Sequence, residues 1–127
     1  MEGGAVEAEK EPQAGVGEAR VEVTYEDFAK LELRVGLVKN AEILEKSEKL
    51  LKLTVDFGTE ERQVLSGIRK FYSPEDVVGK KFVFVTNLQK RKIMGMESQA
   101  MIMAAEDEGG IVLLQPEKDI TPGSKVC

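Results

Sequence analysis

The sequence Leu-Glu-Leu-Arg-Val-Gly-Leu at residues 31–37 alternates apolar side chains with polar or small ones. Such alternation is typical of a β-strand that buries one face. The pattern continues toward Leu44, which predicts a strand about twice the usual length, and Gly36 can supply a bend in it. A second alternation, Leu-Lys-Leu-Thr-Val-Asp-Phe at residues 51–57, predicts a second strand.

More strands are predicted further along the chain. Gly58 begins a turn that leads to a third strand over residues 62–68, and residues 81–86 form a fourth that is apolar on both faces. Residues 100–105 and 111–114 are expected to pair as a hairpin, because two glycines lie between them. A final turn is expected at 121–123, where the sequence is Thr-Pro-Gly.

Two short helices accompany these strands. Thr24 and Asp27 have the spacing of a capping box, which predicts a helix over residues 25–30. Ser73 as a cap, with Pro74 at the first helical position, predicts a second helix, closed by Gly79, between the third and fourth strands. A curved first strand, five or six strands in all and a helix in this place predict an all-β fold. The expected architecture is a Greek-key barrel of the oligonucleotide/oligosaccharide-binding (OB) type.

Charge is distributed unevenly along the 127 residues. Residues 1–22 hold six acidic and two basic residues and few large apolar ones, so we expect a disordered acidic tail or linker there. Residues 23–127 are expected to form the folded domain. Within it, residues 80–103 carry a net charge of +4, although the whole chain has a net charge of −5. A basic stripe on a nearly neutral body favours a local anionic partner.

The composition argues against catalysis. The chain has no histidine and one cysteine, Cys127, which excludes the common histidine-dependent nucleophile systems and ordinary zinc sites. We therefore expect no enzymatic activity, no metal and no cofactor. A lone cysteine fits a reducing compartment, and the longest apolar run is six residues. The protein is expected to be cytoplasmic, without a membrane span.

Lys90, Arg91 and Lys92 are the strongest candidates for ligand binding. They follow the predicted fourth strand, so we expect them on a turn between two buried strands, where they cannot bury their charges. Cations on a rigid edge can bind phosphates, while nearby polar side chains contact sugars or bases. The alternative interpretation of a lone basic triplet is the solvated end of a hairpin.

Several passages, in order, resemble one family. They are Asp27–Gly36, Lys49–Asp56, Ser66–Ile68, Tyr72–Glu75, Asn87–Leu88 and Ser98–Met101. Together they resemble the tRNA-binding domain attached to methionyl-tRNA synthetases and its free-standing relatives, which include an export-related chaperone and multisynthetase cofactors. The resemblance implies an OB-fold barrel with a C-terminal extension, commonly dimeric. It also implies non-catalytic binding of tRNA by shape, which assists an associated synthetase.

The resemblance also implies which residues face RNA. They are Asn87, Lys92, Gly95, Ser98 and Met101, with Lys49 and Arg69 as weaker additions to the basic triplet. Where the family usually has proline this chain has Lys90, so the loop is more cationic. The expected partners are tRNA, an aminoacyl-tRNA synthetase (methionyl) and a second copy of the chain. The alternative function is a chaperone or protein-interaction domain that uses the apolar surface of the barrel.

Some of these residues also have structural interpretations. Asn87 can cap a turn through its side chain. Met101 and Met103 share strand parity, which predicts that both face the core or the mouth of the barrel. Gly36, Gly67 and Gly95 are interpreted as structural first.

Overall fold

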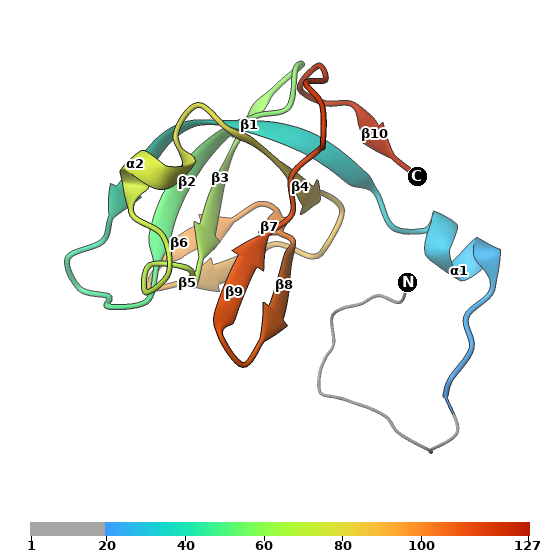
Figure 1. Ribbon diagram of the computed structural model, residues 1–127, viewed down its shortest axis with the longest axis horizontal. Helices are drawn as coiled ribbons and strands as arrows, with labels where there is room; N and C mark the ends of the chain where they lie inside the picture. The colour runs from blue at the N-terminus through green and yellow to red at the C-terminus, as the bar shows by residue number, and fades with distance from the viewer. Residues whose placement is uncertain (1–19) are drawn as a thin grey trace. The chain divides into compact units, whose positions relative to one another are not determined.

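The computed structural model describes residues 20–127, which belong to two compact units (Figure 1). In the first, the described part contains helix α1 (Tyr25–Ala29), and Thr24 and Asp27 form the predicted capping box. The second unit is Leu31–Cys127. The predicted acidic tail falls mostly on residues 1–19, which lie outside the described residues; residues 20–22 form no helix or strand.

The second unit is built on one six-stranded antiparallel sheet. Its strands are β1 (Leu33–Ile43), β2 (Leu51–Asp56), β3 (Glu61–Ser66), β4 (Lys81–Val85), β7 (Met101–Ile102) and β10 (Lys125–Val126). The order is β3-β2-β1-β4-β7, and β10 also pairs with β1.

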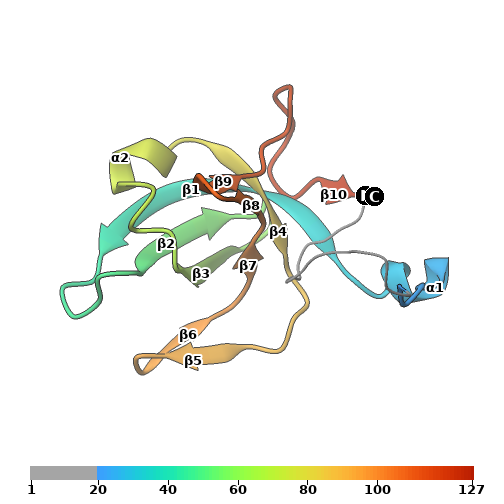
Figure 2. The ribbon, with the colours of Figure 1, turned by 60° about the horizontal axis from the view of Figure 1, so that its bottom comes forward.

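The length of β1 explains how the sheet curves into a barrel. Residues 33–37 of β1 pair with β4, whereas residues 37–43 pair with β2, and the register shifts between Val38 and Asn40. One strand thus serves two neighbours in succession, and the irregularity between its halves bends it (Figure 2). The sheet is nearly closed, which confirms the predicted OB-type barrel with short helices.

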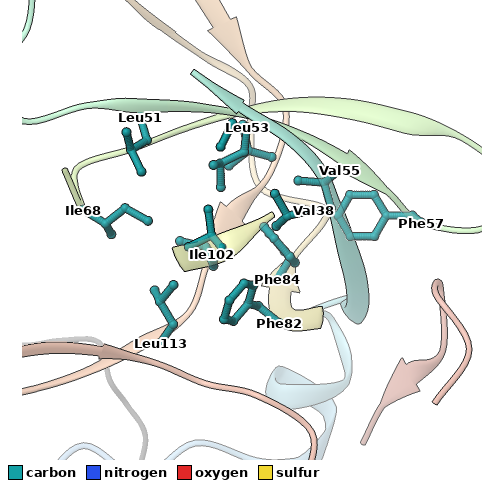
Figure 3. Packing of buried hydrophobic residues seen from close by; sticks show 13 residues of the cluster. Val38, Leu51, Leu53, Val55, Phe57, Ile68, Phe82, Phe84, Ile102 and Leu113 are labelled. Atoms are coloured by element: carbon teal, nitrogen blue, oxygen red, sulfur yellow. The ribbon is translucent and has the colours of Figure 1, made fainter. Parts of the chain in front are cut away.

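Gly36 lies where β1 approaches the core most closely. A Cβ atom on Gly36 would lie 2.5 Å from Val55 Cγ1 and 2.7 Å from the ring of Phe57. The rings of Phe57 and Phe84 pack edge to face, with centroids 5.3 Å apart. These side chains belong to the buried cluster inside the barrel (Figure 3). Gly36 is therefore required by crowding from the core, in addition to any bend in the strand.

The remaining elements are one short helix and two hairpins outside the main sheet. They are α2 (Pro74–Val77), with the capping box of Ser73 and Asp76, and the hairpins β5 (Arg91–Ile93) with β6 (Met96–Ser98) and β8 (Ala104–Asp107) with β9 (Gly110–Leu113). The sequence did not predict the β5–β6 hairpin. The predicted strand 100–105 is divided into β7 and β8 at Met103. The N–H of Met103 donates to the Val83 carbonyl in β4 at 2.9 Å, and its carbonyl accepts from the Leu114 N–H at 3.2 Å.

No helix among residues 20–127 is long and apolar enough to cross a membrane.

The crowding around Gly36 yields a stability prediction. Gly36→Ala should lower the free energy of unfolding by about 1–3 kcal/mol, the usual cost of overpacking a core. Chemical denaturation monitored by circular dichroism measures the change. Gly67→Ala is the matched control, because nothing lies within 4 Å of a Cβ placed there. Its stability should stay within about 0.5 kcal/mol of the parent. Equal stabilities for the two variants would contradict the role assigned to Gly36.

Candidate nucleic-acid interface

The β5–β6 hairpin carries the basic residues. Its turn is Met94-Gly95, with φ values of 54° and 81°, as a two-residue turn of type I′ requires. Lys90 precedes β5, and Arg91 and Lys92 are its first two residues. The cations therefore lie along a strand, and their predicted location on a turn is wrong. The hairpin projects from the barrel at the lower edge of Figure 2.

The strand geometry separates the three cations. Successive side chains of a strand point to opposite faces, so Lys90 and Lys92 share one face of the hairpin and Arg91 points to the other. All three are exposed, and none forms an ion pair or side-chain hydrogen bond with another described residue. Lys92 is in register with Glu97, but the carboxylate of Glu97 accepts a hydrogen bond from Gln99 Nε2 at 3.3 Å instead. The basic charges are therefore available to a ligand.

A cleft of about 380 Å³ lies on the face to which Arg91 points. Its walls come from the end of β3, the loop before β5, the hairpin itself and β7. Three of the predicted RNA-facing residues line it: Arg91, Ser98 and Met101. A guanidinium and apolar side chains thus meet in one depression beside the cationic strand.

Ser98 has a structural role in the cleft wall. It is buried, and its hydroxyl accepts a hydrogen bond from the Leu65 N–H at 3.0 Å and donates one to the Ala100 carbonyl at 3.2 Å. Because a hydroxyl has a single hydrogen, no donor is left for a ligand. Ser98 joins the end of β6 to β3.

Met101 is available on the surface. Its side chain is 43% exposed, whereas the neighbouring Ile102 is 8% exposed and belongs to the core cluster. Of the two predicted positions for Met101, the core and the mouth of the barrel, the structure excludes the core. Met103, which lies outside the core cluster, is half-buried. The β7 strand presents Ile102 inward and Met101 to the cleft.

Asn87 anchors the loop that leads to the hairpin. Its Oδ1 accepts a hydrogen bond from the Glu32 N–H at 2.8 Å. Next to it, the Thr86 hydroxyl contacts Glu32 Oε1 at 2.6 Å. That hydroxyl and then Arg34 hold the pKa of Glu32 below its ordinary value. The ionised Glu32 carboxylate therefore stabilises the folded state at pH values above its ordinary pKa. This stabilisation is lost as the pH falls through the lowered pKa of the folded state.

Of the remaining predicted residues, Arg69 and Lys49 lie away from the hairpin. The Arg69 guanidinium donates to the Ser47 carbonyl, and its backbone N–H donates to the Lys49 carbonyl at 3.0 Å. Arg69 thus holds the loop between β1 and β2. Lys49 is exposed on that loop. Gly95 occupies the tip of the hairpin with a positive φ, which confirms its structural role.

Arg62, which the sequence did not single out, connects both ends of the segment that contains the hairpin. Its guanidinium Nη1 lies 2.6 Å from the carbonyl oxygen of Thr86, where the chain leaves β4. The same atom lies 3.2 Å from the carbonyl oxygen of Gln99, where the chain leaves β6. Glu60 Oε2 lies 2.8 Å from Arg62 Nη2, and the centroid of the Phe57 ring lies 5.7 Å from Arg62 Cζ.

The described residues contain no group of three or more histidine, cysteine, aspartate or glutamate side chains that could hold a metal ion. What the site offers is cations, an apolar cleft and a few polar groups.

Comparison with known proteins places the chain in a family. Residues 33–125 match the family model described as "Putative tRNA binding domain". The methionine–tRNA ligase of Archaeoglobus fulgidus is 50% identical over 110 residues, which are 87% of this chain and 17% of that protein. This chain thus spans about a sixth of the length of such relatives.

Two solved structures have the same fold. A crystal structure of a MetRS related protein from Pyrococcus horikoshii matches with a TM-score of 0.81 and 41% identity, over 85% of this chain and 100% of that one. The chaperone CsaA from Bacillus anthracis matches with a TM-score of 0.77 and 33% identity, over 84% of this chain and 100% of that one.

The position of Arg62 predicts that it holds the hairpin segment on the barrel. Arg62→Met keeps an unbranched apolar chain but removes both hydrogen bonds, so the free energy of unfolding should fall by about 1.5–3 kcal/mol. Lys39→Met is the control, because its ion pair with Glu61 is 3.5 Å long and exposed; such pairs contribute about 0–1 kcal/mol. Denaturation curves measure both. A loss for Arg62→Met no larger than that of the control would rule out the clamp.

Proposed function

Because the chain belongs to the family of tRNA-binding domains, we propose that it binds tRNA without catalysis. In this role it assists an aminoacyl-tRNA synthetase, and the methionyl enzyme is the expected partner. The observation that carries the proposal is the β5–β6 hairpin, which holds three exposed cations without partners among the described residues. In the bound state Lys90, Arg91 and Lys92 lie against phosphates of the tRNA backbone. Asn87 and Met101 lie beside them.

Recognition in this scheme depends on shape more than on sequence. Cations on two faces of a narrow hairpin reach phosphates on either side of it, as the backbone of a folded RNA can provide. Ser98, Arg69 and Gly95 contribute by holding the loops and the hairpin that present the contacts. Lys49 adds a charge on the neighbouring loop.

Assistance to a synthetase is suggested by the relatives of the chain. The Archaeoglobus relative is a methionine–tRNA ligase, and only 17% of it aligns with this chain. A binding module of this kind raises the local concentration of tRNA at a catalytic unit, whether the two are joined or associate as separate chains.

A protein-binding function is the second candidate, since the chaperone CsaA shares the fold and 33% of its residues. Leu88 and Met101, both 43% exposed, offer apolar contacts beside the cleft. Salt separates the two functions, because binding to phosphates weakens steeply as salt rises and apolar capture does not.

We further propose that two copies associate through the C-terminal extension. Val112 and Leu114 alternate with the buried Leu113, so both point outward, with exposed fractions of 62% and 37%. Outward apolar side chains on one strand favour a symmetric contact.

The phosphate contacts can be tested by replacing Lys90, Arg91 and Lys92 together with alanine. Affinity for tRNA should fall, and the slope of log affinity against log salt should decrease by roughly 2 to 3, since each contact contributes about 0.7–0.9. Fluorescence anisotropy over a range of salt concentrations measures both. The control is Lys80→Ala, Lys118→Ala and Lys125→Ala combined, which removes the same charge from exposed positions outside the site. Unchanged affinity and slope in the hairpin variant would refute the site.

Association can be tested by sedimentation. The parent should sediment as a dimer of the 14.0 kDa chain, because pairing removes Val112 and Leu114 from water. Val112→Asp should shift it toward the monomer, since a carboxylate is costly to bury. Thr59→Asp, at the exposed turn between β2 and β3, is the matched control and should leave the dimer intact. A monomeric parent would end this proposal.

A further inference from the structure

Gly67 is the one glycine among the described residues for which the fold gives no requirement. Gly58, Gly79, Gly95, Gly110 and Gly123 have positive φ values, Gly36 is crowded by the core, and Gly109 lies 3.3 Å from a carboxylate. Gly67 has no positive φ, and nothing lies within 4 Å of a Cβ built on it. Its interpretation as structural is therefore not supported by its surroundings.

The position of Gly67 suggests why a side chain is absent. It directly follows β3 and forms part of the wall of the cleft beside the hairpin. Glycine at such a wall permits a ligand to approach the backbone closely. The free space next to Gly67 is thus a property of the cleft.

The lining of the cleft indicates the chemistry of that ligand. Leu50, Leu65, Ile93 and Met101 supply apolar surface, and Arg91 supplies a planar cation. A guanidinium and a thioether both pack well on the face of an aromatic ring. Gln89 also lines the cleft, and its side-chain amide forms no hydrogen bond with another described residue. An amide can read the hydrogen-bonding edge of a base.

We propose that this cleft accepts one unpaired nucleobase of the bound RNA, packed against Arg91 and Met101 and passing close to Gly67. The cleft's volume of about 380 Å³ lies at the small end of ligand pockets, which suits a single nucleotide. The phosphate of that nucleotide then lies near Arg91 in the cleft wall, while Lys90 and Lys92 bind the RNA backbone on the other face of the hairpin. The proposal rests on the tRNA-binding function above and adds a requirement for an unstacked nucleotide.

Charge favours a nucleotide over an apolar peptide in this cleft. Residues 80–103, which contain the hairpin, carry a net charge of +4. Arg91 is in the wall itself. An apolar side chain entering the cleft would cover this guanidinium without neutralising it, whereas a nucleotide brings its own phosphate and a ring for the guanidinium to stack on.

The test uses two RNA probes that differ by one nucleotide. One is a blunt-ended duplex, and the other is the same duplex with a single bulged fluorescent adenine analogue. The parent protein should bind the bulged duplex roughly tenfold more tightly, the effect of stacking one base. The fluorescence of the adenine analogue should change as the analogue enters the cleft.

Gly67→Leu is the decisive variant, because it adds a large side chain at the cleft wall, from a Cβ position with nothing within 4 Å. It should lose the preference for the bulged duplex and keep the affinity and salt slope of the parent for the blunt one. Gly67→Ala should give an intermediate preference. Thr59→Leu, at an exposed turn that does not line the cleft, is the control for an added leucine and should bind as the parent does.

The possible outcomes are distinct. If Gly67→Leu keeps the preference, or the parent shows none while binding RNA in a salt-dependent manner, the cleft proposal is overturned and the tRNA-binding function stands. Absence of binding to either RNA and to tRNA overturns both. If Gly67→Leu impairs only capture of a reduced, unfolded protein, the cleft is a peptide site. Should melting curves show that Gly67→Leu is unfolded, Met101→Ala must lower the bulge preference for the proposal to hold.

Discussion

The hydrogen bonds along the free edge of β3 hold the candidate interface to the barrel. This edge has no neighbouring strand in the main sheet. Its backbone groups bond instead to the segment that leaves the hairpin: Gln63 O accepts from the Gln99 N–H at 2.8 Å, and Gln63 N donates to Gln99 Oε1 at 2.9 Å. Leu65 N donates to Ser98 Oγ at 3.0 Å. One backbone N–H and two side-chain oxygens thus replace the hydrogen bonds of a neighbouring strand. Without them the backbone groups at this edge would be left unsatisfied.

This closure has a consequence for the cations. The segment from Thr86 to Gln99 begins and ends on carbonyls that the same arginine, Arg62, binds. On the other side, Glu32 contacts both Thr86 and Asn87. A hairpin held at its base in this way presents its charges in a narrow range of positions. Less conformational freedom is lost when a polyanion binds, which is the usual advantage of preorganised contacts.

The sequence predicted the parts of the fold that depend on alternation and caps. The alternating residues 31–37 and 51–57 correspond to β1 and β2, and both capping boxes are present. The β5–β6 hairpin was missed because its strands have three residues each and its turn is Met-Gly, without the asparagine or aspartate that usually marks a type I′ turn. The apolar run 100–105 does not show which of its two faces is buried, so Met101 could be assigned to the core or to the mouth of the barrel. In the structure Ile102 belongs to the core cluster, and Ala100 and Ala104 pack against that cluster.

The site was harder to predict than the fold, because the contacts that position its residues do not depend on residue types that a sequence reveals. The basic triplet is plain in the sequence, but its division between two faces depends on a strand whose existence was not predicted. Arg62 binds backbone carbonyls, which carry no sequence signal, and Gly67 is informative only once the space around it is known. The chain as a whole is acidic, with a net charge of −5. The net charge therefore gives no general attraction to a polyanion, and an RNA gains most from electrostatics where it meets the hairpin. Orientation and affinity then depend on the same few residues.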